Sequence, residues 1–205
     1  PEELIDGMRG IRTGIFQRHE TLNKAAERAT AAHLRALLKR CPKSWLDNPV
    51  VSFEQAETYA ALGGEFFQEA CRLYSIAIAA EDRARRVPIT AIEQLANIES
   101  KLGELSGAPA LIDRAIERLH DLDRVVAGSV DYSSGQRITA ATTRANIERQ
   151  ALVGSAYKRK AAIFARQILD RKTPDLPKAI KQFDEAIAAA QKAVELSQRG
   201  PGALG

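Results

Sequence analysis

Little in this sequence of 205 residues favours β-structure, a disulfide or a membrane span. Aromatic residues make up only 5% of it, and β-branched runs are scarce outside Pro49–Val51. Its two cysteines, Cys41 and Cys71, form no Cys-x-x-Cys pair, so reduced thiols in a cytosolic protein are favoured over a disulfide. No stretch approaches the ~18 apolar residues of a membrane span, and no signal-peptide pattern precedes the first expected helix. We therefore expect a soluble, cytoplasmic protein without strands.

A block of charge of one sign is also missing. The 30 basic and 26 acidic residues give a net charge of +4, and the two signs are interleaved, as on solvated helical faces. The short basic clusters 83–86 and 158–160 could contact phosphates, but no aromatic side chain is placed to stack on bases. This disfavours nucleic-acid binding.

Catalytic and metal-binding groups are not gathered either. The three histidines, His19, His33 and His120, stand in no His-x-x-x-His or Glu-x-x-His arrangement, which is typical of surface or half-buried positions. There is no glycine-rich phosphate loop after a strand, and Gly154-Ser155 lacks the second glycine of a nucleophile elbow. We predict no enzymatic activity, no catalytic residue, no metal site and no cofactor.

Alanine, by contrast, is frequent, and apolar residues recur at helical spacing along the chain. Gly7, Gly10 and Gly14 predict that any first helix is weak, and an apolar stripe then predicts one long helix up to Cys41. Capping-box patterns at Ser52–Gln55 and Thr90–Glu93 predict two further helix starts. The length suffices for one core or for three to four helical hairpins.

The last third of the chain predicts an antiparallel pair of helices, in which Gly154 lets the second helix approach the first closely. The pattern resembles the tetratricopeptide repeat, whose first helix carries a large residue, Gly and an aromatic, and whose second carries Ala, an aromatic and Ala. In the expected pair of helices that precedes the last one, Leu119 occupies the position where the repeat pattern has an aromatic residue. This departure weakens the match. The positions that match in the last pair are Val153, Gly154, Tyr157, Ala179, Phe183 and Ala186.

Two segments, 143–159 and 91–99, are also similar to the repeat regions of bacterial proteins that carry a caspase-like CHAT protease domain. The resemblance covers residues 52–196 and implies an all-α fold of stacked antiparallel helical hairpins that form a right-handed superhelix. The remaining divisions are an N-terminal helical segment, 1–41, and a flexible tail, 197–205. Because the chain begins at Pro1 without an initiating Met, we expect a segment of a longer protein, with a CHAT-type protease as the parent.

In stacked helical hairpins the first helices line a concave groove that binds an extended or helical peptide. The residues one, four and five positions after Ala96 and after Gly154 are expected to face this groove. They are similar to the carboxylate-binding set of chaperone-binding tetratricopeptide domains, so a protein or acidic peptide is the expected partner. Ordinary exposed helix residues are the alternative for this set: Asn97, Ser100, Lys101, Ser155, Lys158 and Arg159.

The sequence thus predicts a non-catalytic scaffold or regulatory module that binds proteins. A small helical enzyme or a helical nucleic-acid-binding domain is the alternative.

Overall fold

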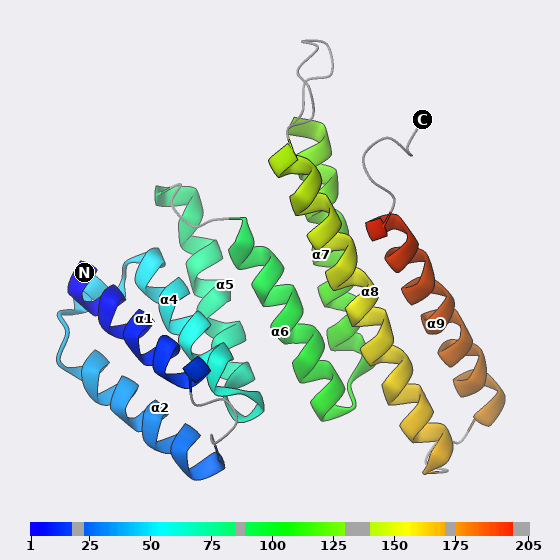
Figure 1. Ribbon diagram of the computed structural model, residues 1–205, viewed down its shortest axis with the longest axis horizontal. Coiled ribbons are helices and arrows are strands. Elements are labelled where there is room, and N and C mark those ends of the chain that lie inside the picture. The colour runs from blue at the N-terminus through cyan, green and yellow to red at the C-terminus, as the bar shows by residue number, and fades with distance from the viewer. Residues whose placement is uncertain (18–22, 85–88, 130–139, 171–174, 199–205) are drawn as a thin grey trace. The chain divides into compact units, whose positions relative to one another are not determined.

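The computed structural model describes residues 1–17, 23–84, 89–129, 140–170 and 175–198 (Figure 1). Throughout these ranges the regular structure is helical, and no strand occurs in them. The chain divides into two compact units, residues 1–98 and 99–205, which are described separately below. The all-α prediction, with antiparallel helical hairpins of tetratricopeptide type, is confirmed.

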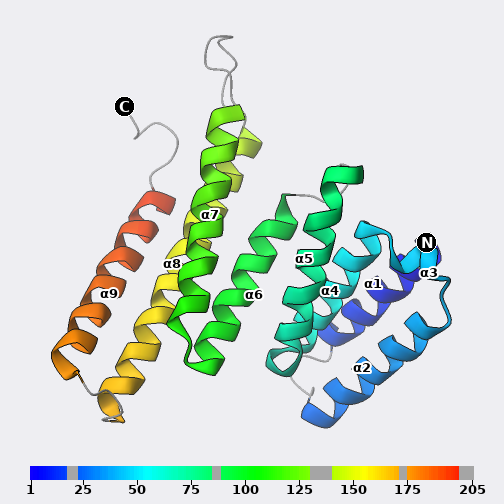
Figure 2. The same ribbon diagram turned by 180° about the vertical axis from the view of Figure 1, so that it is seen from behind.

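The first unit is built around the hairpin of α4 and α5, on which α1 packs through its contact with α4 (Figure 2). Helix α4 ends at the glycine pair 63–64, where Gly63 has a φ of 102° that L side chains rarely adopt. The elements of this unit are α1 (Glu2–Gln17), α2 (Lys24–Lys39), α3 (Lys43–Leu46), α4 (Pro49–Leu62), the 3-10 turn η1 (Gly64–Phe66), α5 (Phe67–Ala84) and the first half of α6 (Thr90–Ser106).

Aromatic side chains hold the α4–α5 hairpin together. The rings of Phe53 and Tyr74 meet edge to face with centroids 5.9 Å apart. The Tyr74 hydroxyl donates to Glu57 Oε1 at 2.5 Å. Burial of the ring, and next the charge of Glu57, raise the pKa of Tyr74, so this hydroxyl stays protonated.

The prediction of a weak first helix is wrong. Helix α1 runs over 16 residues and buries Leu4, Met8 and Ile15 despite its three glycines. Its polar side is fixed to α4, because Arg9 Nε and Arg12 Nη1 donate to the buried carboxylate of Glu54 at 3.0 and 2.9 Å. Tertiary packing and these ion pairs offset the low helix propensity of glycine.

The single long helix expected up to Cys41 is also wrong, because Asn23 interrupts it. Asn23 has extended dihedral angles, and its Oδ1 accepts from the backbone N–H of Ala26 at 3.0 Å. This is an N-cap, and α2 begins after it.

The capping box expected at Ser52 is likewise wrong. Helix α4 starts at Pro49, after Asn48, whose Oδ1 accepts from the N–H of Val50 at 2.9 Å. Proline suits the first helical position because its missing N–H would lack an intrahelical partner there anyway. Ser52 therefore lies inside the helix and is buried.

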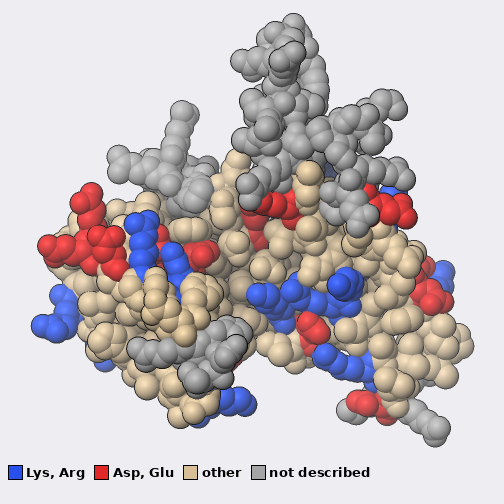
Figure 3. Space-filling view, in the orientation of Figure 1, with Lys and Arg blue, Asp and Glu red and all other residues tan. Residues whose placement is uncertain are grey.

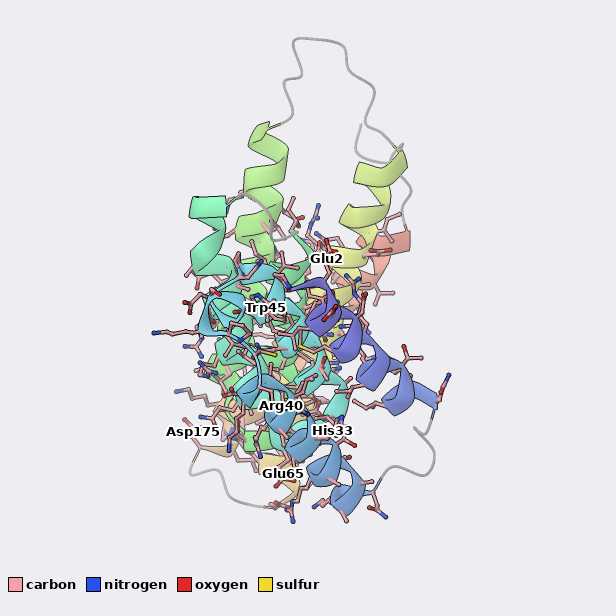
Figure 4. All side chains as sticks on the ribbon, turned by 90° about the vertical axis from the view of Figure 1, so that its left-hand side faces the viewer. Glu2, His33, Arg40, Trp45, Glu65 and Asp175 are labelled. Atoms are coloured by element: carbon pink, nitrogen blue, oxygen red, sulfur yellow. The ribbon has the colours of Figure 1, made fainter. Side chains whose placement is uncertain are left out.

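Trp45 lies on the short helix α3, close to the first turn of α1, where Figure 4 shows it near Glu2. It is half-buried, and the two residues line one pocket of about 680 Å³.

The second unit continues α6 and adds α7 (Pro109–Ser129), α8 (Ala140–Leu169) and α9 (Leu176–Gln198). A turn joins α6 to α7, with Gly107 at a φ of 66° and Pro109 as the first residue of α7. Next to this turn, a Cβ on Gly103 would lie 2.8 Å from Ile112 Cγ1 and 3.0 Å from the Ala108 carbonyl oxygen. Only glycine fits such a close approach without a shift of its neighbours.

The predicted pairing of the last two helices is confirmed as well. Helices α8 and α9 pack against each other in antiparallel fashion (Figure 1). A Cβ on Gly154 would lie 3.3 Å from the Cβ of Ala193 on α9, which is tight contact. Ala179 and Ala186 are buried, as the small positions of the repeat pattern require. Helix α9 is described as far as Gln198, and the rest of the tail predicted for 197–205 lies outside the described residues.

Candidate partner-binding face

Helices α6 and α8 lie side by side in the second unit, and Arg159 of α8 joins them. Its Nη1 donates to the Ser100 hydroxyl oxygen on α6 at 3.0 Å, and its Nε lies 3.6 Å from Glu104 Oε2. The Arg159 side chain is only 19% exposed. Burial lowers the pKa of Arg159, while the charge of Glu104 acts to raise it. The guanidinium is thus a partly desolvated, positioned donor group.

Glu104 is shared by two arginines. Its Oε1 accepts from Arg166 Nη2 at 3.2 Å, while its other oxygen, Oε2, is the one that faces Arg159. Arg166 follows Arg159 by two helical turns on α8, so both reach the same stretch of α6. Two guanidinium groups therefore flank a single carboxylate.

Lys101 adds a further positive charge to α6. It is half-buried, and burial lowers its pKa, with the nearby charge of Arg159 as the second cause. The two cations are thus near enough to destabilise each other in their charged forms.

The other predicted site residues are spread along the same two helices. Lys158 is exposed, beside Arg159 in the chain, and Ser155 is half-buried one turn earlier on α8. Asn97 is half-buried one turn before Lys101 on α6. The structure therefore brings Ser100, Lys101 and Arg159 together.

We call the following set the basic face. Figure 3 shows Lys and Arg side chains gathered over α6 and α8, with an acidic group among them. Four cationic side chains and one carboxylate give it an excess of positive charge. Its members are Ser100, Lys101, Glu104, Lys158, Arg159 and Arg166.

Sequence reasoning missed Glu104 and Arg166. Their spacing offered a signal, because Glu104 is one turn after Lys101 and Arg166 is two turns after Arg159, on the helix faces already selected. Which carboxylate would meet which arginine depends on the register of α6 against α8, and that register was not predictable.

The neighbouring ion pairs of this unit hold helices together. Buried Glu99 accepts from Arg118 Nε at 2.8 Å across the α6–α7 hairpin. Arg149 of α8, also buried, donates to Asp123 of α7 at 2.5 Å. Such buried charges need their partners to offset desolvation, so we assign them to packing.

Within the described ranges, no three or more His, Cys, Asp or Glu side chains lie grouped so that they could hold a metal ion. None of the helices in those ranges combines the length and the apolar character that a bilayer crossing requires.

Comparison with known protein families gave a match over the C-terminal two thirds of the chain. The family model described as Tetratricopeptide Repeats-Sensor matches residues 66–200, which include α5 to α9 and the whole basic face. No curated protein and no solved structure matched the chain.

Proposed function

Because the chain belongs to the Tetratricopeptide Repeats-Sensor family, we propose that it is a non-catalytic module that binds a protein or peptide partner through the basic face. Tetratricopeptide repeats stack into extended surfaces, and these surfaces bind peptide segments of partner proteins. The observation that carries the proposal is Arg159, held between Ser100 and Glu104 on the neighbouring helix.

The charge of this face favours an acidic partner. Hydrogen bonds between a guanidinium and a carboxylate are stronger than neutral ones and can be bidentate. Arg159 and Arg166 present two such groups, and Lys101 and Lys158 add charge beside them. An aspartate or glutamate side chain, or a free C-terminal carboxylate, would gain contacts with several of these groups at once.

Positioning of Arg159 also favours binding. A free arginine loses rotamer entropy when a ligand immobilises it. Here the contact with Ser100 and partial burial have already restricted the side chain. Less entropy is therefore lost when the partner binds.

As the biological context, we propose a scaffold or regulatory role in the cytoplasm, within a longer bacterial protein such as a CHAT-type protease. The similarity of segments 91–99 and 143–159 to the repeat regions of such proteins supports this parent. The extent of the repeat domain, 52–196, with an N-terminal segment at 1–41, stays part of the proposal.

A helical nucleic-acid-binding domain or a small helical enzyme is the alternative. The four cationic side chains of the basic face could contact the phosphates of a nucleic acid, because such contacts depend on positive charge and not on base sequence. Competition by a short duplex DNA and by an RNA strand separates this alternative from an acidic peptide.

Site-specific photocrosslinking in the cell of origin tests the proposal. A photoreactive amino acid replaces exposed Lys158 on the basic face, and in a control it replaces exposed Lys181 on α9. We expect one protein, attached through an acidic segment, to crosslink at position 158 and not at 181. Equal crosslinking at both positions, or attachment through a basic segment, would contradict the proposal.

A further inference from the structure

A second polar site lies among α7, α8 and α9, and it shares no residue with the basic face. It is a pocket of about 390 Å³. The side chains from each helix follow helical spacing, so one face of each helix contributes. The lining consists of Pro109 and Asp113 of α7, Lys160, Phe164 and Gln167 of α8, and Asp175, Lys178, Ala179 and Gln182 at the start of α9.

Two acidic and two basic side chains line this pocket. On one wall, Lys160 Nζ lies 2.6 Å from Asp113 Oδ1, joining α8 to α7. The other wall carries Asp175 and Lys178, and Asp175 Oδ1 accepts from the backbone N–H of Lys178 at 3.0 Å. The four formal charges sum to zero.

Apolar and amide groups complete the lining. Phe164 and Ala179 are buried and supply an apolar base. Gln167 and Gln182 are half-buried, and each amide can donate and accept hydrogen bonds. A ligand with a short apolar part and polar ends would match this arrangement.

The charge pattern decides the class of ligand. A phosphate or another compact anion would meet the carboxylates of Asp113 and Asp175, and like charges repel. A wholly apolar ligand would desolvate charged groups without giving them hydrogen bonds, which is costly. A molecule with an ammonium and a carboxylate can satisfy both signs.

We propose that this pocket binds a small zwitterion of the amino-acid class. The carboxylate lies between Lys160 and Lys178 and contacts both, the ammonium contacts Asp113 or Asp175, and a short side chain lies on Phe164. Such a ligand bridges α8 and the start of α9, so its binding stabilises the second unit against unfolding.

Calorimetric titration and thermal unfolding of the full chain with each of the twenty amino acids, one at a time, test this. We expect at least one of them to bind and to raise Tm as its concentration rises. For the best binder, the amine without the carboxylate and the acid without the ammonium are titrated as well. Both halves should bind at least about tenfold more weakly, because each loses one charge-assisted contact.

Variants then locate the site. Lys160→Met and Lys178→Met should each weaken binding at least about tenfold through loss of a charged partner. Lys181→Met, on the same helix as Lys178 but outside the pocket, serves as the matched control and should bind normally. Lys160→Met removes the ion pair with Asp113 and could disturb packing. Lys178 is exposed, so Lys178→Met should keep the fold and tests the site independently.

The proposal is overturned if no amino acid binds, or if either half-molecule binds as tightly as the whole. It is equally overturned if Lys178→Met, folded as judged by circular dichroism, retains full affinity.

Discussion

Arg159 donates from Nη1 to the hydroxyl oxygen of Ser100 at 3.0 Å, a bond between residues 59 positions apart in the chain. Both residues were selected from the sequence because each falls at a fixed distance from a small residue of its own helix. Their meeting indicates that α6 and α8 present matching faces, as the first helices of successive hairpins do.

The first prediction concerns Glu104, which occupies the two arginines that an acidic partner would use. Glu104→Gln removes a charge that competes with the partner's carboxylate and leaves the side chain nearly the same size. We expect affinity for an acidic peptide to rise by about threefold to tenfold, equivalent to roughly 1 kcal/mol. Fluorescence anisotropy with a labelled peptide measures this.

Glu99→Gln is the matched control for charge, since Glu99 also pairs with arginines of this unit but lies outside the basic face. Unchanged or lower affinity in Glu104→Gln would show that Glu104 helps to hold the arginines in place for the partner.

The second prediction concerns Lys101, whose pKa is lowered by burial and by Arg159. A lysine with a lowered folded-state pKa destabilises the fold while it is charged. This loss of folding stability is fully present at pH values below the pKa of Lys101 in the folded state. It disappears as the pH rises from that value to the ordinary pKa of 10.5, which applies to the unfolded chain. Lys101→Met should therefore raise Tm at neutral pH by about 1–3 °C, and the gain should shrink at alkaline pH.

Lys158→Met, at an exposed position, should leave Tm unchanged at every pH. The same Lys101→Met variant should bind the acidic peptide more weakly, so stability and affinity should move in opposite directions. A lower Tm at neutral pH would show that contacts of the Lys101 side chain outweigh the cost of its charge.

The third prediction compares two helical glycines. In Gly103→Ala the new Cβ meets Ile112 Cγ1 and a backbone oxygen at 2.8 and 3.0 Å, so we expect a loss of ~1–3 kcal/mol. In Gly154→Ala the nearest atom is 3.3 Å away, and the gain in helix propensity of about 1 kcal/mol offsets most of the strain. Gly154→Leu, whose side chain must push α9 away, should again cost ~1–3 kcal/mol or more.

Urea denaturation gives the unfolding free energies of the three variants. Equal losses for the two alanine variants would mean that the neighbourhood of Gly103 relaxes freely. No loss in Gly154→Leu would contradict the close packing of α8 on α9.

Local patterns in the sequence were enough to predict the hairpins. Gly154 and Ala186 mark the close approach of α8 and α9, because small size is a property of the single residue. Gly103 was missed, since its importance comes from where Ile112 of the next helix falls.

Errors arose where distant residues decide local structure. The glycines of α1 predict a weak helix, yet Glu54, more than 40 positions away, binds both Arg9 and Arg12. Glu104 and Arg166 could not be paired from the sequence for the same reason, because they are 62 positions apart.

The most direct test is the salt dependence of binding to the acidic segment identified by crosslinking. Affinity is measured at low and moderate salt for the unmodified chain and for Lys158→Glu with Arg159→Glu. Lys181→Glu with Lys192→Glu, two exposed positions of α9, gives the same change in net charge as a control.

Exposed charges are screened over about 8–10 Å near physiological ionic strength. We therefore expect the affinity of the unmodified chain to fall with salt, and the reversal at 158 and 159 to weaken binding mainly through slower association, with little change in the control. Full affinity without salt dependence in the 158 and 159 reversal would contradict the account and exclude the basic face as the binding site.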